Sequence, residues 1–220
     1  MPRRLEAHVE ILPAPQRDIW PRLAPTVGLS FVLYGGTAVA LHLGHRVSVD
    51  FDFFRSEPLD KAALRSALPF LGDAAILQEE VDTLAASVAT RSGLVRLAFF
   101  GGIAFGRVGE PLQTSDGTLL VASLNDLLAT KLKAILDRAE ARDYRDIAAM
   151  LRHGASLEFG LGAFRAMFAG EPATVLRAIG FFDDGDLPSL ATVDREILVA
   201  ARDHVCDVPA VPVISTALAV

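Results

Sequence analysis

The sequence predicts an α/β (α+β) fold in which a core with a mixed β-sheet is followed by a helical C-terminal half. Two observations carry this prediction. Short β-rich runs separated by turns fill the chain up to about residue 122, whereas helix-forming stretches follow one another from Ser123 onward. The composition agrees, because 51% of the 220 residues are apolar, which is enough for a substantial core and too many for a disordered chain.

The first half is expected to alternate strands with short helices. Its helices are predicted over 16–23, 37–43 and 59–68. Its strands are predicted over 31–34, 47–54, 74–78, 84–90, 94–100 and 118–121. Pro21 is expected to distort the first helix, and the pair Gly35-Gly36 ends the first strand in a turn. The first dozen residues are expected to be poorly ordered or to form an edge segment.

The second half is expected to be helical. Ser123 and Asp126 resemble a capping box that opens a helix ending near Ala139. Further helices are predicted over 143–152, 158–169, 172–179 and 193–204. Three regions follow from these boundaries: a core over 1–122, a helical region over 123–206 and an apolar tail over 207–220, for which the sequence predicts no role.

Charge and cysteine content exclude several classes of protein. The chain carries 21 Lys and Arg against 27 Asp and Glu, so no global basic field indicates a nucleic-acid-binding protein. The single cysteine, Cys206, excludes an intramolecular disulfide and a Cys-rich zinc site. No stretch resembles a signal peptide, so a cytoplasmic location is expected. The uncharged run from Leu23 to Gly44 is interrupted by Gly35-Gly36, and a buried strand and helix explain it better than a membrane span.

Two aspartates stand on one predicted strand. Residues i and i+2 of a strand point to the same side, so Asp50 and Asp52 present neighbouring carboxylates, while Val49, Phe51 and Phe53 are expected to fill the buried side. Two close carboxylates repel each other unless a cation lies between them. A hard divalent cation with oxygen ligands, Mg²⁺ or Mn²⁺, is therefore predicted at this place.

A glycine turn precedes these aspartates. Gly35-Gly36 before a helix N-terminus offers backbone N–H groups to a phosphate, and Thr37 adds a hydroxyl. Asp-x-Asp alone also occurs in glycosyltransferases and in haloacid-dehalogenase-type phosphatases, although the phosphatases have Thr or Val where this chain has Phe54. The ordered combination, with 14 residues from Gly36 to Asp50, is more specific and predicts a nucleoside triphosphate (NTP) site.

Four stretches together resemble a known family. The first contains Gly35-Gly36-Thr37, His45-Arg46, Ser48 and Asp50-x-Asp52-Phe53-Phe54. The others are Asp126-Leu127-Leu128-Ala129-Thr130-Lys131-Leu132-x-Ala134 with Arg138, Arg142-Asp143-x-x-Asp146-Ile147, and Phe181-Phe182-Asp183-Asp184. They resemble the AbiEii/AbiGii-type nucleotidyltransferase toxins of the DNA polymerase β-like nucleotidyltransferase superfamily, over nearly the whole chain. The resemblance implies a polymerase β-like core with a mixed sheet.

The resemblance also implies roles for individual residues. Asp50 and Asp52 would hold the metal that bridges the triphosphate, Lys131 corresponds to the catalytic lysine, and Asp146 corresponds to the aspartate of the last motif. The implied nucleotide-binding residues are Gly35, Gly36, Thr37, Arg46 and Ser48. A lysine beside a transferring phosphate is a sound electrostatic stabiliser. Lys133, which faces elsewhere, is expected to be an ordinary solvated lysine.

Three features leave alternatives open. On a continuous helix, the arginines at positions 138, 142 and 145 would share one face; these are Arg138, Arg142 and Arg145. This face would either contact an acceptor RNA or be exposed to solvent. The strand over 94–100 lacks the third metal-binding carboxylate of many superfamily members, so the site would hold one or two ions. Lys131 and Asp146 would lie ~22 Å apart on an unbroken helix, so a shared site requires a turn near 139–143, where Asp143 would cap a second helix.

The predicted function is metal-dependent transfer of a nucleoside monophosphate from an NTP to an acceptor hydroxyl. The resemblance implies the toxin of a bacterial toxin–antitoxin pair, with a cognate antitoxin as partner and RNA, such as a tRNA 3′ end, or protein as acceptor. Two alternatives stay open: a nucleotide-binding regulator with weak or no turnover, and a nucleotidyltransferase acting on a small molecule such as an aminoglycoside. No membrane partner is expected.

Overall fold

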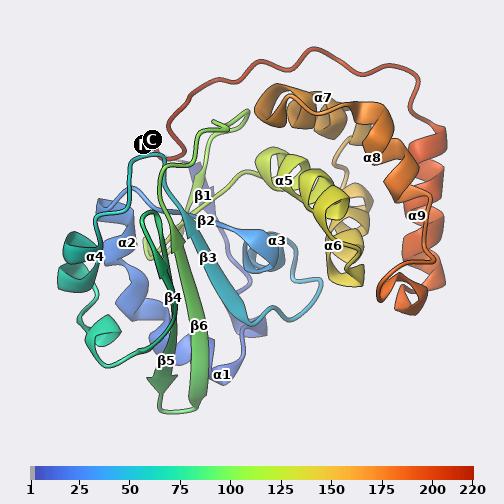
Figure 1. Ribbon diagram of the computed structural model, residues 1–220. Coiled ribbons are helices and arrows are strands. Elements are labelled where there is room, and N and C mark those ends of the chain that lie inside the picture. The colour runs from blue at the N-terminus through green and yellow to red at the C-terminus, as the bar shows by residue number, and fades with distance from the viewer. Residues whose placement is uncertain (1–2) are drawn as a thin grey trace. The chain divides into compact units, whose positions relative to one another are not determined.

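The computed structural model describes residues 3–220 and divides the chain into two compact units (Figure 1). Unit 1 contains the chain up to Gly106, together with Glu110–Ser123 and Ser215–Val220. Unit 2 contains Arg107–Gly109 and Leu124–Ile214. Across residues 3–220, no helix is long and apolar enough to cross a membrane.

Unit 1 is built on an eight-stranded mixed sheet. Its strands are β1 (Arg3–Leu5), β2 (Val32–Tyr34), β3 (Asp50–Phe54), β4 (Ala75–Glu80), β5 (Thr83–Thr90), β6 (Gly93–Phe100), β7 (Leu112–Thr114) and β8 (Leu120–Val121). They lie in the order β1-β7-β8-β2-β3-β6-β5-β4. The β1–β7, β2–β8 and β3–β6 pairs are parallel, and the other pairs are antiparallel. Arg3–Leu5 therefore form an edge strand, one of the two outcomes expected for the first dozen residues, while residues 1–2 lie outside the described residues.

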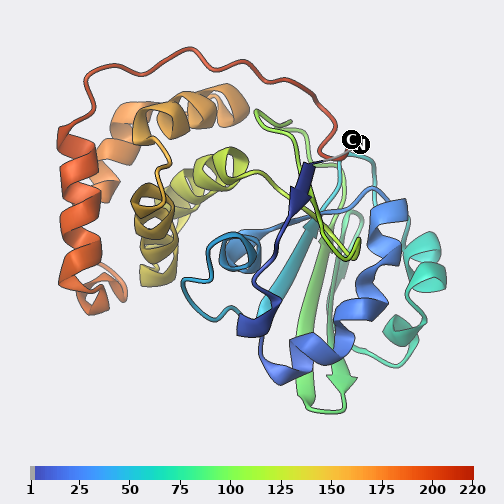
Figure 2. The same ribbon diagram turned by 180° about the vertical axis from the view of Figure 1, so that it is seen from behind.

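Helices cover both faces of this sheet. They are α1 (Ala14–Ile19), α2 (Pro25–Gly28), α3 (Gly35–Leu43) and α4 (Lys61–Ala67). Figures 1 and 2 show α3 on one face and α1, α2 and α4 on the other. Stacked and edge-on rings of Phe31, Phe53 and Phe99 lie in the core, with ring centroids 5.1–6.3 Å apart. Pro21 lies in a 3₁₀ turn (Trp20–Leu23) after α1, which confirms the expected distortion of this helix.

Unit 2 is a helical bundle. Its helices are α5 (Leu124–Asp137), α6 (Ala141–Arg152), α7 (Leu157–Phe168), α8 (Pro172–Ile179) and α9 (Thr192–Asp203). α5 packs against α6, α7 and α8, and α6 packs against α9. The helix α7 approaches α5 closely because Gly160 has no side chain; a Cβ there would lie 2.6 Å from Leu128 Cδ2. As predicted, α5 begins directly after Ser123. Asp126 is buried and accepts the backbone N–H of Val108 at 2.7 Å.

The C-terminal tail, for which the sequence predicted no role, is held at several points. Within unit 2, Arg165 donates to the carbonyl of Pro209 at 3.2 Å, and Ile214 N–H donates to the carbonyl of Arg107 at 2.8 Å. Within unit 1, the Leu218 N–H donates to Ser56 Oγ at 2.9 Å, and the Leu218 side chain is buried. The tail therefore belongs to the packed structure of both units.

The predicted strand over 47–54 is too long. β3 begins at Asp50, and residues 44–49 form an irregular connection after Gly44, whose φ of +61° ends α3. Val49 is 59% exposed, so its predicted burial is wrong, whereas Phe51 and Phe53 are buried as predicted. The register explains the difference, because β6 pairs with β3 only from Asp50 onward.

Candidate functional site

The two aspartates of β3 lie on one side of the strand. Asp50 and Asp52 are partly exposed, whereas the alternate residues Phe51 and Phe53 are buried. β3 lies between β2, which places Tyr34 opposite Asp52, and β6. The central position of β3 in the sheet fixes the direction of both carboxylates.

Gly35 forms the sharp turn from β2 into α3. Its φ of +72° lies in the left-handed region that favours glycine. A Cβ at this position would lie 2.5 Å from Asp52 Oδ2, which is closer than two such atoms can approach. The carboxylate of Asp52 therefore lies directly against the first residue of α3, at the end of the helix where backbone N–H groups are not used by the helix itself.

Gly36 has a similar role toward the connection that follows α3. A Cβ on Gly36 would lie 2.5 Å from a terminal nitrogen of Arg46 and 3.1 Å from Ser48 Oγ. Arg46 also donates to the carbonyl of Val47 at 3.0 Å. The structure thus brings Arg46 and Ser48 together over the first turn of α3.

Thr37 is buried, and its hydroxyl donates to the backbone carbonyl of Asp50. This bond links the first turn of α3 to the start of β3. Because the hydroxyl is used in this bond, the group that this turn offers to a phosphate is the backbone N–H.

The donors on β3 suit a divalent cation in the presence of a polyphosphate. In the register of β6, Asp50 lies beside Arg96 and Asp52 beside Ala98. Across residues 3–220, no group of three or more His, Cys, Asp and Glu side chains is arranged to hold a metal. Mg²⁺ is commonly held by one or two carboxylates plus phosphate oxygens and water, so Asp50 and Asp52 fit an ion that shares its coordination with a bound triphosphate.

A cluster of buried charges lies in unit 2. Lys131 Nζ, on α5, is 2.6 Å from Asp143 Oδ1 and 2.7 Å from Asp146 Oδ2, both on α6. The Lys131 side chain is 6% exposed, and both carboxylates are fully buried. Arg138 Nε lies 2.8 Å from Asp143 Oδ2. The turn needed to bring Lys131 and Asp146 together is therefore present.

That turn consists of residues 138–140, between the end of α5 at Asp137 and the start of α6 at Ala141. Asp186 Oδ1 accepts the N–H of Ala141 at 2.6 Å and satisfies the first turn of α6. Gly185, with a φ of +52°, makes this approach possible, because a Cβ there would lie 2.2 Å from the carbonyl oxygen of Ala139. The expectation that Asp143 caps the second helix is wrong, since the N-cap is Glu140 and Asp143 lies in the first turn.

Electrostatics in this cluster favour the charged form of the aspartate at its centre. Burial raises the pKa of Asp143, but the charges and hydrogen bonds of Lys131 and Arg138 outweigh burial and lower the pKa below its usual value. The neighbouring Tyr144 shows the opposite effect: burial and the negative charges of Asp143 and Asp184 raise its pKa. Asp143 therefore remains a carboxylate at neutral pH.

The three arginines do not share one helix face. Arg138 lies in the connection between α5 and α6, whereas Arg142 and Arg145 lie on α6, so the continuous helix on which the three would share one face is not formed. Arg142 Nε bonds Glu140 at 2.5 Å. Lys133 pairs with Asp137 on the exposed side of α5, which confirms it as an ordinary solvated helix lysine.

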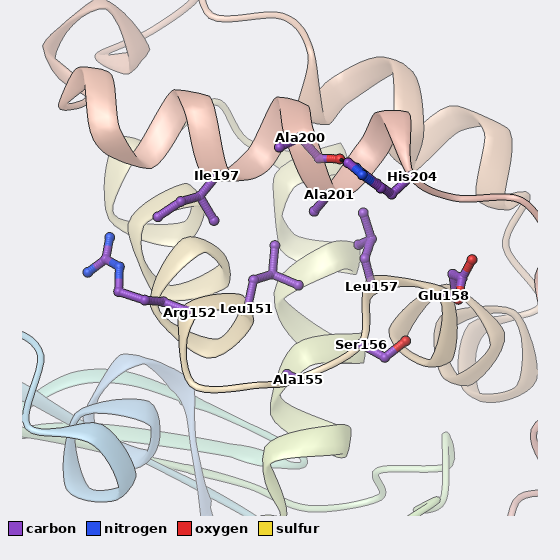
Figure 3. Close-up of a pocket in the computed structure, with 10 residues that line it drawn as sticks. All are labelled: Leu151, Arg152, Ala155, Ser156, Leu157, Glu158, Ile197, Ala200, Ala201 and His204. Atoms are coloured by element: carbon purple, nitrogen blue, oxygen red, sulfur yellow. Dashed lines mark hydrogen bonds between the residues drawn. The ribbon is translucent and has the colours of Figure 1, made fainter.

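A separate cavity lies in unit 2 between α6, α7 and α9 (Figure 3). It has a volume of about 400 Å³, with Leu151, Leu157 and Ile197 among the apolar residues that line it. None of the predicted site residues lines this cavity. Polar groups at its edge bond within the protein: Arg152 donates to Asp194 at 2.8 Å, and His204 Nδ1 lies 2.6 Å from the carbonyl of Ala200.

These features define the class of protein as a nucleotidyltransferase. They are a sheet that carries paired aspartates and a glycine turn, followed by helices with a buried lysine. Residues 22–205 match the family described as "Nucleotidyl transferase AbiEii toxin, Type IV TA system", and the chain belongs to this family. The match covers most of both units and confirms the resemblance stated from the sequence.

Two individual proteins are similar to this chain. A crystal structure of a candidate nucleotidyltransferase from H. pylori aligns with a TM-score of 0.56 at 22% identity, covering 86% of this chain and 90% of that one, which shows a shared fold. The uncharacterized protein aq_aa25 of Aquifex aeolicus (strain VF5) is 30% identical over 131 residues, or 58% of this chain. The matched part spans 61% of the length of that protein.

Proposed function

We propose that the chain transfers a nucleoside monophosphate from an NTP to an acceptor hydroxyl, as the toxin of a toxin–antitoxin pair. The observation that carries the proposal is the close approach of Asp52 to Gly35 and of Arg46 and Ser48 to Gly36. This approach gathers carboxylates, a cation, a hydroxyl and free helix N–H groups in one place, as the binding of a metal-bound triphosphate requires.

In unit 1, each group has a defined task in the proposal. Asp50 and Asp52 hold Mg²⁺ or Mn²⁺, which neutralises charge on the triphosphate when it is bound. The phosphates are contacted by Gly35, Gly36, Thr37, Arg46 and Ser48. The oxygen of the acceptor hydroxyl attacks the α-phosphorus and its proton passes to water. The bond between the α-phosphorus and the oxygen that bridges to the β-phosphorus breaks, and pyrophosphate leaves.

In unit 2, Lys131 stabilises the negative charge that develops during transfer. An ammonium group has three N–H donors. Two of them are directed at Asp143 and Asp146, and the third is proposed to bind a phosphate oxygen. Asp146 is proposed to act in the reaction by holding Lys131 charged and oriented.

The acceptor is proposed to be RNA, such as a tRNA 3′ end, or a protein. Candidate contacts for an RNA backbone are Arg138, Arg142 and Arg145. The first two side chains are about half exposed, which suits contact with phosphates. A cognate antitoxin is the implied protein partner, and a cytoplasmic location is proposed.

The experiment is incubation of the purified protein with each α-labelled NTP and Mg²⁺, Mn²⁺ or EDTA, in the presence of total RNA, purified tRNA or protein. Metal-dependent label on RNA or protein is expected, and Asp52→Asn is expected to abolish it. Asp137→Asn, which changes an exposed carboxylate outside the site, serves as the matched control and should label normally.

A second candidate function is a nucleotide-binding regulator without turnover. The observation that favours it is the presence of Arg96 and Ala98 on β6 beside Asp50 and Asp52, where further metal-binding carboxylates would stand. NTP binding without transfer to any acceptor would support this function. Transfer to an aminoglycoside but not to RNA or protein would support the small-molecule alternative.

A further inference from the structure

We propose that Asp143 is a positioning residue that fixes the direction of the Lys131 ammonium group, with Arg138 as its second cationic partner. The proposal rests on the proposed function, because the direction of Lys131 matters only if Lys131 acts on a phosphate. It adds a residue to the machinery beyond Lys131 and Asp146.

Asp143 lies at the centre of the buried cluster. Its Oδ1 accepts Lys131 Nζ at 2.6 Å and a terminal nitrogen of Arg138 at 3.4 Å, and its Oδ2 accepts Arg138 Nε at 2.8 Å. Both oxygens of this fully buried carboxylate therefore bond to cations, one from α5 and one from the connection that leads to α6.

The charge balance shows that Asp143 is not needed merely to neutralise Lys131. Lys131 and Asp146 already form an ion pair at 2.7 Å. Adding Asp143 places one more buried negative charge beside this pair, where an unbalanced charge is costly. Arg138, which is about half exposed and also lies 3.5 Å from Glu140, brings a second positive charge. A simple ion pair would have sufficed for stability, so the additional pair of charges points to a requirement for geometry.

Asp143 adds a second hydrogen-bond partner that fixes the direction of the Lys131 ammonium group. A lysine ammonium on its flexible four-carbon stem can turn about a single hydrogen-bond partner. Asp143 and Asp146 stand three residues apart on α6 and so lie on the same face of this helix. Two N–H donors bound to two carboxylates on one rigid helix leave the third N–H pointing in one direction only. This is the preorganisation that transition-state stabilisation needs.

The direct test is Asp143→Asn, which keeps the shape of the side chain and removes its charge. We expect kcat for transfer to fall at least tenfold, with the KM for NTP changed by less than about threefold, because a misdirected Lys131 loses its transition-state contact. Asp143→Glu should recover part of the rate.

Asp137→Asn is the matched control, since Asp137 pairs with Lys133 on the exposed side of α5, the helix that carries Lys131. It should leave both kcat and the KM for NTP unchanged. A kcat for Asp143→Asn within twofold of the wild type would overturn the proposal.

A stability cycle tests the contact without activity. Asp143→Asn should lower the melting temperature in the wild-type background but leave it unchanged or raise it in a Lys131→Met background, where the buried carboxylates have lost a cation. Equal effects of Asp143→Asn in the two backgrounds would show that Asp143 does not hold Lys131, and would also overturn the proposal. A wild type that transfers no nucleotide would contradict the proposed function, while this cycle would still decide the contact.

Discussion

The Asp52 carboxylate occupies the space that a side chain at Gly35 would need: the missing Cβ would lie 2.5 Å from Asp52 Oδ2. The close packing of these two residues sets the position of the carboxylate relative to the first turn of α3. Gly35 therefore tolerates substitution poorly, because its φ of +72° also disfavours any residue other than glycine.

Gly35→Ala is therefore expected to abolish transfer and to lower the free energy of unfolding by about 1–3 kcal/mol, from left-handed backbone strain and displacement of Asp52. Thermal unfolding and transfer assays on the same preparation measure both effects. Gly28→Ala is the matched control, because no atom lies within 4 Å of the added Cβ, and it should be nearly neutral. Full activity of Gly35→Ala would contradict the proposed role of this turn.

Asp50→Asn and Asp52→Asn should each abolish metal-dependent transfer while the protein stays folded. Each change removes a ligand charge without changing volume, and relief of repulsion between the two carboxylates should keep the change in stability small. A Mn²⁺ titration followed by electron paramagnetic resonance, in the presence of NTP, measures the lost binding directly. If both variants bind Mn²⁺ and transfer nucleotide normally, the carboxylates are not metal ligands.

Lys131→Ala should lower the rate of transfer by about 10²–10³, more than it weakens NTP binding. It should also reduce the free energy of unfolding by about 3–5 kcal/mol, because the change leaves Asp143 and Asp146 buried without their shared cation. Lys133→Ala, at an exposed position on the same helix, should change neither quantity noticeably. Equal, mild effects from the two variants would mean that α5 carries no catalytic lysine.

Stability should fall in mild acid because of His42. Burial lowers the pKa of this imidazole below its usual value near 6.5, and the hydrogen bond to the carbonyl of Ala122 at 2.9 Å offsets this only in part. The unfolded chain then binds a proton that the folded chain does not, so stability is lost as the pH falls from about 6.5 toward the lowered pKa. The loss should approach about 1.4 kcal/mol per pH unit within this window.

Urea unfolding at pH 8, 6 and 5 measures this effect, and His42→Gln should flatten the dependence, since glutamine does not titrate. Asp116, whose pKa is lowered to about 2, and Asp143, whose pKa is also lowered, change the free energy of unfolding in a separate pH range below pH 4. An unchanged slope between pH 6 and 5 in His42→Gln would assign the acid sensitivity to another group.

Gln16 offers a change that should increase stability. Its side chain is 1% exposed where α1 packs against β5 and β6, and neither of its amide atoms has a hydrogen-bond partner among residues 3–220. Burial of an unpaired amide costs free energy, so Gln16→Met, of similar length, should raise the free energy of unfolding by about 1–2 kcal/mol. A decrease measured by urea unfolding would show that the amide is satisfied in solution.

The parts of the site that were predictable from the sequence are those whose geometry is local. The alternation of Asp50 and Asp52 with buried phenylalanines needs only the two-residue period of a strand, and the Gly35-Gly36 turn needs only the backbone freedom of glycine. Because the sequence shows the order of these elements, the candidate site in unit 1 could be predicted from the pattern of residues along the chain. The extent of β3 could not be predicted in this way, because it depends on which residues of β6 pair with β3. For this reason the prediction that Val49 is buried was wrong.

The cluster in unit 2 depends on contacts between distant residues. The sequence predicted a break near residues 139–143, but no Gly or Pro there specifies the turn, which is held by Asp186 and Gly185 from a later loop. The three arginines would have shared one face only on a continuous helix, and the chain turns between them. Asp143 could have been recognised from its three-residue spacing to Asp146, which places two carboxylates on one helix face, but its partner Lys131 on the preceding helix could not have been identified from that spacing.

The chain passes from one unit to the other four times, after Gly106, Gly109, Ser123 and Ile214. The sheet half therefore cannot be obtained by cutting the gene after its last strand. Such a fragment would lack Leu218, which is 1% exposed, and the two hydrogen bonds of Ser56 to the final residues. A substitution of Leu218 would consequently destabilise the sheet half, although that half lies mostly more than a hundred residues earlier in the sequence.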